Sequence, residues 1–120
     1  MNFTIETEFK NDVQIIRLIG NLDNVAADFL FEMFMRATAV PSPKILLNLA
    51  HVSNTLIDLN ETYPLSVILW GLIRARKKNG DLILCSLPPW MEDDMTLTHL
   101  NEAIGVYKDE ETALLALNEK

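Results

Sequence analysis

The residue types that most often carry out chemistry are scarce in this sequence, and they form no catalytic pattern. The two histidines, His51 and His99, lack the spacing of a metal-binding pair. Cys85 stands inside an apolar run, where a thiol is usually inert. The acidic run at 92–94 is better explained by a favourable interaction with a helix dipole than by metal binding. We therefore expect no enzyme activity, no metal site and no cofactor.

A hydroxyl group that could accept a phosphate is a different kind of chemical site, and Thr62 is its best candidate by position. Thr62 precedes Tyr63 and Pro64, an order typical of a helix start, with a capping hydroxyl followed by proline in the first turn. A phosphate there would add up to about two negative charges. The alternative is an ordinary N-cap, which stabilises a helix by about 1 kcal/mol. Tyr63 is expected to pack, and Ser66 to lie on the helix surface.

The elements that position these residues begin with a hairpin and a helix. Residues 3–9 and 13–19 have strand character, and Asn11-Asp12 between them predicts a turn. A helix is expected from about 25 to 39, capped by Asp23 or Asn24. Its spacing predicts a wet face of Asp28, Glu32 and Arg36 and a buried stripe of Ala26, Phe29, Leu30, Met33 and Ala37.

Helices and strands then alternate. Residues 45–49 read as a central strand, followed by an unusually long loop over 50–61. The second helix is expected to end near Lys78 or Asn79, with Gly80 in the left-handed conformation. A strand at 81–85, a helix at 91–101, a short strand at 106–107 and a last helix capped by Asp109 complete the order. This predicts an α/β fold with a mixed sheet of four to five strands and about four helices mainly on one face.

Length and composition narrow the functional classes. The 120 residues fit one domain, 1–120, with a net charge of −7 that disfavours nucleic-acid binding. No apolar run approaches the roughly 18 residues of a membrane span, so no membrane insertion is expected. The single cysteine and the absence of a signal-peptide pattern indicate the cytoplasm. The one basic cluster, which is expected at the end of the second helix to complement its dipole, comprises Arg74, Arg76, Lys77 and Lys78.

Four segments together resemble the STAS domains of bacterial anti-sigma factor antagonists. These segments are VQIIRLIGNLD at 13–23, ILLNLAHV at 45–52, GDLILCSLPP at 80–89 and DEETALLAL at 109–117. They resemble, in order, the family's opening strand with Gly-x-Leu-Asp, its central strand, its later strand with a proline turn and its closing helix. The resemblance implies a STAS-like fold and a regulator of transcription that acts by partner switching with an anti-sigma factor or a related serine kinase-like protein. The alternative is a non-phosphorylated structural STAS subunit of a larger assembly, such as a stressosome or a lipid-transport ATPase complex.

The sequence departs from the family's phosphorylation motif. Anti-sigma antagonists carry Asp-Ser-Ser-Gly-Leu, or a close variant, at the start of the second helix. Aligned backward from Val67, this chain has ETYPLS at 61–66; aligned forward from Val52, it has Ile57-Asp58 followed by Leu59 and Asn60. The two registers differ because the loop carries about five extra residues. Neither restores the serine pair, which leaves Thr62 as the acceptor candidate.

The family's docking site implies a partner surface around this loop and the first half of the second helix. Ser66, Trp70, Arg74 and Lys77 share one side of that helix by their spacing. Trp70 is then either an interface anchor or a residue at the edge of the core. Phe31 and Met35 on the first helix raise the same question. The expected partner-binding residues are Asp58, Asn60, Glu61, Thr62, Tyr63, Ser66 and Trp70, and a homodimer is an open alternative for the assembly.

Overall fold

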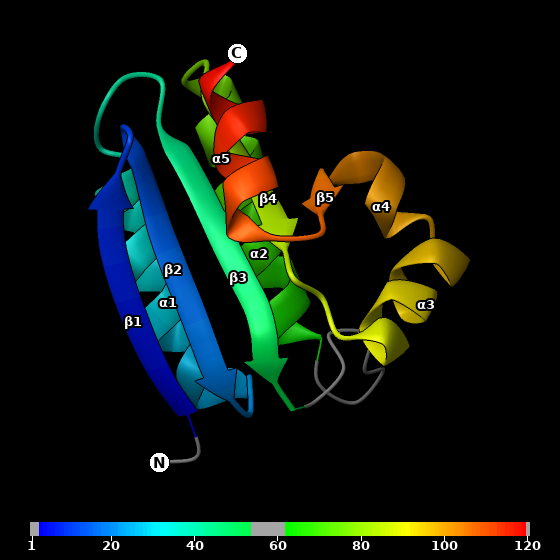
Figure 1. The fold of residues 1–120 in the computed structure, drawn as a ribbon. Helices are drawn as coiled ribbons and strands as arrows, with labels where there is room; N and C mark the ends of the chain where they lie inside the picture. Colours follow the sequence, from blue (N-terminus) through cyan, green and yellow to red (C-terminus); the bar gives the residue numbers. More distant parts are fainter. Residues whose placement is uncertain (1–2, 54–61, 120) are drawn as a thin grey trace.

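A five-stranded sheet in the order β1-β2-β3-β4-β5 runs through the middle of the computed structural model, which describes residues 3–53 and 62–119 (Figure 1). The strands are β1 (Phe3–Lys10), β2 (Val13–Gly20), β3 (Lys44–Val52), β4 (Asp81–Cys85) and β5 (Val106–Tyr107). β1 is antiparallel to β2, whereas β2, β3, β4 and β5 are parallel neighbours. The central strand expected at 45–49 and the strand expected at 81–85 are both present, and they pair as β3 and β4.

The hairpin follows from the turn residues. Asn11 and Asp12 both have positive φ, 52° and 67°, which is the backbone of the tight turns that match strand twist. Asn and Asp tolerate this conformation better than other non-glycine residues. Lys10 is therefore opposite Val13, and the two strands pair without interruption back to Phe3 and Gly20.

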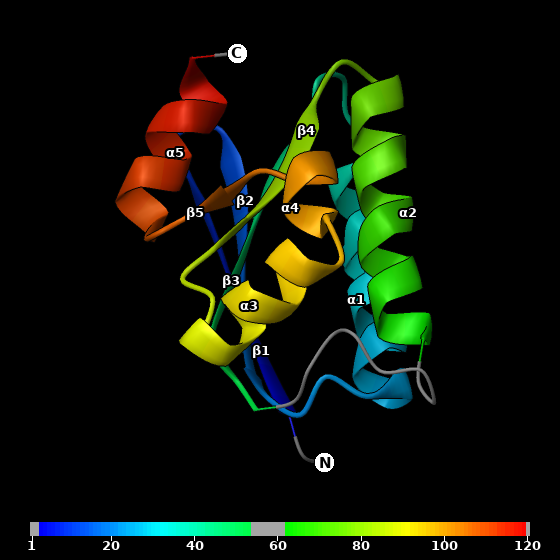
Figure 2. The same ribbon diagram turned by 90° about the vertical axis from the view of Figure 1, so that its right-hand side faces the viewer.

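Helices cover both faces of the sheet, with more of them on one face (Figures 1 and 2). The first face carries α1 (Asn24–Ala37) and α2 (Tyr63–Lys77), and α3 (Pro89–Leu97) adds Met91 and Met95 to the same core. The short α4 (Leu100–Ala103) follows α3, and α5 (Glu110–Asn118) packs on the second face. This confirms the expected fold class, with five strands and five helices in the described part of the chain.

The two faces have separate apolar cores. On the first face, the fully buried ring of Phe34 lies against Gly71, where a Cβ atom on the glycine would come within 2.6 Å of the ring. Glycine at this position therefore sets how closely α1 and α2 approach. The smaller core of the second face consists of Val13, Ile15, Leu46, Ile83, Cys85, Ala113, Leu114 and Leu117.

The buried stripe predicted for α1 is partly wrong. Phe29 is 49% exposed and Met33 and Ala37 are half-buried, while Ala27 and Phe34 are fully buried. The observed buried face of α1 is rotated about the helix axis relative to the predicted stripe, because α2 packs beside α1 on the side that carries Ala27 and Phe34. The wet face was predicted correctly, since its three charged residues are exposed.

Several predicted boundaries also differ. Asn79, not Gly80, has the left-handed backbone after α2, with φ of 66°. Gly80 is needed for another reason: a Cβ there would lie 1.8 Å from the Pro43 carbonyl oxygen. The helix expected at 91–101 is broken at His99, whose φ of 61° separates α3 from α4. β3 continues to Val52, so the loop begins later than expected, and residues 54–61 lie outside the described part.

Candidate protein-binding site

The start of α2 presents two exposed hydroxyl groups. Thr62 occupies the N-cap position, but its backbone is helical (φ −89°, ψ −12°) and its side chain makes no capping hydrogen bond. The capping role expected for its hydroxyl is therefore wrong. Instead, the Thr62 carbonyl accepts hydrogen bonds from both the backbone N–H and the Oγ of Ser66, each at 3.0 Å. Both side chains are exposed, so the Thr62 hydroxyl is accessible at the beginning of a well-formed helix.

Tyr63 ties this helix start to α1. Its hydroxyl donates a hydrogen bond to Asp28 Oδ1 at 2.7 Å, and its side chain remains 39% exposed. The hydrogen bond to Asp28 is the main cause that raises the pKa of Tyr63 above its usual value. The phenol thus stays a donor at neutral pH, and the packing role expected for Tyr63 becomes a polar bridge between two helices.

Trp70 lies one to two turns further along α2 and is half-buried. Its ring stacks at a tilt on Phe31 of α1, with 4.4 Å between the ring centroids, and the Arg74 guanidinium lies 5.4 Å from the centroid of the Trp70 ring. Trp70 thus packs at the edge of the core and keeps part of its surface exposed, so its position is compatible with both alternatives left open by the sequence. Its packing on two neighbours holds the ring in one place, as a contact residue requires.

The basic cluster at the end of α2 is mostly engaged within the molecule. Arg74 donates to Thr38 Oγ1 at 2.8 Å, and Lys78 donates to the Thr38 carbonyl at 2.6 Å. Arg76 forms an ion pair with Asp81 at 3.1 Å. These contacts anchor the end of α2 to the end of α1 and to β4. They support the structural role expected for the cluster, while Lys77 remains exposed.

The structure brings part of the predicted partner surface together and adds residues to it. Thr62, Tyr63, Ser66 and Trp70 follow one side of α2, whereas Asp58, Asn60 and Glu61 lie outside the described residues. The pairing of Asp28 with Tyr63 was not predicted from the sequence, because it joins residues on two helices. Ile73, which is 54% exposed, was not predicted either. The signal that could have found Ile73 is its position three residues after Trp70. The two α1 residues that raised the same question as Trp70 differ in their surroundings. Phe31 packs against the Trp70 ring, whereas Met35 is 47% exposed.

The chemistry that this surface can perform is recognition. It combines exposed hydroxyls, a carboxylate, an aromatic ring and flanking apolar side chains on two rigid helices. Cys85 lies elsewhere, fully buried in β4, where burial raises the pKa of its thiol to about 11 and keeps it protonated. Within residues 3–53 and 62–119, no three potential metal-ligating side chains cluster, and no helix there is long and apolar enough to cross a bilayer.

Comparisons with known proteins agree with the fold described above. The family model for the STAS domain matches residues 4–113. An anti-sigma-factor antagonist (STAS) domain protein from Planctomyces limnophilus has a TM-score of 0.76 at 20% identity, over 95% of this chain and 97% of that chain. The anti-sigma factor antagonist SpoIIAA, in its unphosphorylated form, has a TM-score of 0.73 at 19% identity, over 98% of each chain. A sulfate transporter family protein from Wolinella succinogenes has a TM-score of 0.73 at 17% identity, over 93% of this chain and 89% of that chain. At these identities the likeness shows a shared fold.

Proposed function

The chain belongs to the STAS domain family, and from this premise we propose that it is a bacterial, cytoplasmic regulator of transcription that acts by partner switching. Its partner is an anti-sigma factor or a related serine kinase-like protein, which docks on the start of α2. No catalytic role and no cofactor are proposed for this chain. Two of the structural neighbours are described as anti-sigma factor antagonists, which supports this class of partner.

The observation that carries the proposal is the fixed, exposed start of α2. Two links to α1 hold it: the Tyr63–Asp28 hydrogen bond of 2.7 Å and the Trp70–Phe31 stack of 4.4 Å. Thr62 and Ser66 stand exposed beside these links. A surface with a half-buried tryptophan surrounded by polar groups has the composition of an interface hot spot. Little ordering is then needed when a partner binds.

Thr62 is the proposed phospho-acceptor. Its hydroxyl does not cap α2, so modification would break no capping hydrogen bond. A phosphate would add up to about two negative charges at this point of a chain whose net charge is already −7. The N-terminal N–H groups of α2 tolerate that charge, whereas an acidic partner surface would reject it. Phosphorylation therefore releases the partner in this proposal.

The test starts with purification of the tagged chain from its native cell and identification of the protein that co-purifies. Binding of the purified pair is then measured by calorimetry. We expect Trp70→Ala to weaken binding by about 2 kcal/mol, as for an interface anchor. Thr62→Glu is also expected to weaken it, by adding charge at the switch position. Leu115→Ser on α5 is the control, because Leu115 is 62% exposed on the opposite face of the sheet. Unchanged affinity in both folded variants would place the docking surface elsewhere.

The second candidate function is a structural STAS subunit of a larger assembly, such as a stressosome or a lipid-transport ATPase complex. Two observations favour it: the Asp-Ser-Ser-Gly-Leu motif is absent, and a sulfate transporter family protein shares the fold. Size-exclusion chromatography of the native complex separates the two candidates. A stable, large complex insensitive to Thr62→Glu supports the subunit, whereas a small complex released by Thr62→Glu supports partner switching.

A further inference from the structure

β1 is an edge strand, and its outer side is open in the described part of the chain (Figure 1). A two-residue hairpin loop is closed by a hydrogen-bonded pair, here Lys10 and Val13. Counting back from this pair, every second residue points its backbone N–H and C=O outward, away from β2. Ile5, Thr7 and Phe9 therefore present a row of donors and acceptors that another strand can use.

This edge lacks most of the features that normally prevent strand addition. β1 has eight consecutive pairs with β2, so no bulge twists it away from a neighbour. It contains no proline, and its only lysine is its last residue, Lys10. Phe9, beside that lysine, is 68% exposed. An unprotected edge of this length is a site for another extended chain.

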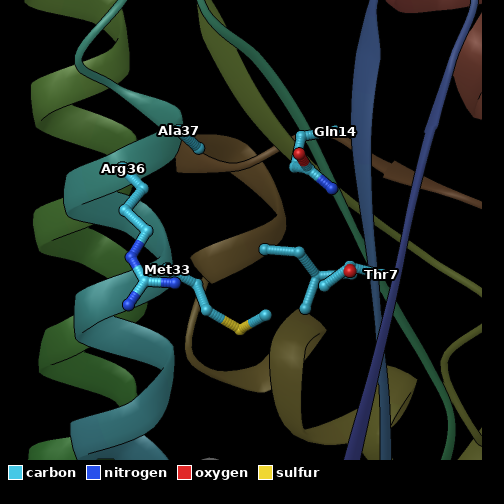
Figure 3. A pocket seen from close by; sticks show the side chains of 6 residues that line it. Thr7, Gln14, Met33, Arg36 and Ala37 are labelled. Atoms are coloured by element: carbon cyan, nitrogen blue, oxygen red, sulfur yellow. The ribbon is translucent and has the colours of Figure 1, made fainter.

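On the α1 side of β1, Thr7 lines an open hollow of about 210 Å³ between β1, β2 and α1. Figure 3 shows the side chain of Met33 reaching from α1 toward Thr7, with Ala37 and Gln14 nearby. Arg36 stands at the rim of the hollow. Exposed apolar residues extend this border toward both ends of β1: Phe9 and Val40 at one end, and Phe29, whose ring lies against Phe3, at the other.

The opposite side of β1 carries two glutamates and, at its end, one lysine. Side chains alternate along a strand, so Glu6, Glu8 and Lys10 share the face that carries α5. Both glutamates are exposed, and Glu8 Oε1 accepts a hydrogen bond from Arg17 at 2.9 Å. An antiparallel second copy of β1 centred on Thr7 would set its Glu6 and Glu8 opposite Glu8 and Glu6, and directly opposed like charges destabilise a strand pair. Basic side chains complement these two glutamates.

We propose that β1 binds, by strand addition, an extended segment of a protein partner in which apolar residues alternate with lysine or arginine. The apolar residues face the hollow beside Met33, and the basic residues face Glu6 and Glu8. Backbone hydrogen bonds to Ile5, Thr7 and Phe9 supply affinity, and the alternation supplies specificity. This site goes beyond the proposed function, because it lies along the β1 side of α1, whereas α2 packs on the other side of α1, toward β4 (Figure 1).

The test uses a synthetic peptide, acetyl-Lys-Val-Lys-Val-Lys-Val-Lys-Val-amide, titrated into the ¹⁵N-labelled chain and followed by NMR. We expect saturable shifts centred on the amides of Ile5, Thr7 and Phe9. Thr7→Pro removes one outward N–H without touching the pairing with β2 and should weaken binding about tenfold or more. The matched control, Thr7→Val, keeps the N–H and should bind within about twofold of wild type. If Thr7→Pro does not fold, the same peptide with alternate backbone nitrogens methylated replaces it, and it should fail to bind.

Charge recognition is tested by reversing the charge of Glu6 and, separately, the charge of the peptide. Glu6→Lys should weaken binding of the lysine peptide and strengthen binding of the corresponding glutamate-valine peptide. Trp70→Ala should leave lysine-peptide binding unchanged, which separates this site from the α2 surface. Three results would overturn the proposal: no saturable binding by wild type, equal binding by Thr7→Pro or by the methylated peptide, or equal affinity for both peptides. Dimerisation of wild type through β1 in sedimentation experiments would also overturn it, by making a second copy the occupant.

Discussion

The two faces of the sheet are held to their helices by different forces. On the first face, α1 and α2 pack through fully buried apolar side chains such as Phe34, and polar contacts lie at the ends of the seam. On the second face, α5 buries a smaller apolar cluster and is also tied by Glu110, which accepts hydrogen bonds from Arg17 and Asn48. The first attachment should therefore depend on side-chain volume, and the second also on charge and pH.

The largest effect on stability is expected at the interface between α1 and α2. Phe34→Ala removes a fully buried ring and leaves a cavity against Gly71, which should lower the free energy of unfolding by about 3–5 kcal/mol. Phe29→Ala on the same helix is the matched control, since Phe29 is 49% exposed and should cost much less. Urea denaturation measures both. Equal losses would contradict the rotated stripe described for α1.

A smaller effect is expected on the second face. Glu110 accepts two hydrogen bonds from Arg17, at 2.7 and 2.8 Å, and one from Asn48 Nδ2 at 2.6 Å. Glu110→Gln removes the charge and part of this network, and should cost about 1–2 kcal/mol, since the group is partly exposed. Glu111→Gln, one residue later and exposed, should cost less than about 0.5 kcal/mol. Urea denaturation and amide exchange in α5 report the difference.

At acid pH, the stability cost of Glu110→Gln should disappear. The hydrogen bond from Arg17 lowers the pKa of Glu110 below its usual value. A carboxyl group whose pKa is lowered by folding stabilises the protein above its unfolded pKa of about 4.3, and this stabilisation is lost as the pH falls toward the folded pKa. Wild type and Glu110→Gln should therefore converge in stability below about pH 4. If the difference in stability between wild type and Glu110→Gln stays constant from about pH 7 to about pH 3, the charge of Glu110 is not what holds α5.

The smallest effect concerns the hydrogen bond between Tyr63 and Asp28 at one end of the α1–α2 interface. Because the hydrogen bond to Asp28 raises the pKa of Tyr63, Asp28→Asn should bring that pKa back toward its ordinary value. Ultraviolet titration in a Tyr107→Phe background isolates Tyr63, since the chain has only two tyrosines. Glu32→Gln, on the same exposed face of α1, serves as the control and should not move the titration. No shift with Asp28→Asn would mean that the two helices are not joined by this bond in solution.

Much of the fold was predictable because local chemistry dictates it. Asn11-Asp12 supplied the hairpin turn, and the predicted caps Asp23 and Asp109 each accept a backbone N–H of their helix, from Ala26 and Thr112. The apolar runs gave the central strands, and their alternation with helices gave the layered α/β arrangement. Each of these signals depends on residues within a few positions of one another.

The candidate site was predictable in part. The spacing of Ser66 and Trp70 indicated one side of α2, and the structure places both there. Helical spacing, however, gives no account of which neighbour covers a residue. Trp70 could have been an exposed anchor or a core residue, and its contact with Phe31 decides that it lies between these limits. Thr62 has the sequence signature of a capping residue, but its helical backbone removes the capping bond.

By itself the sequence determined the order of the elements, the turn and helix-cap chemistry and the scarcity of catalytic groups, because these depend on residue types and short spacings. Only the tertiary structure decided which side of α1 faces α2, how Arg17 meets Glu110 across 93 positions and why Gly80 must be glycine. These depend on how closely elements distant in sequence approach one another. That approach is set by the packing of whole helices against the sheet, which no local pattern encodes.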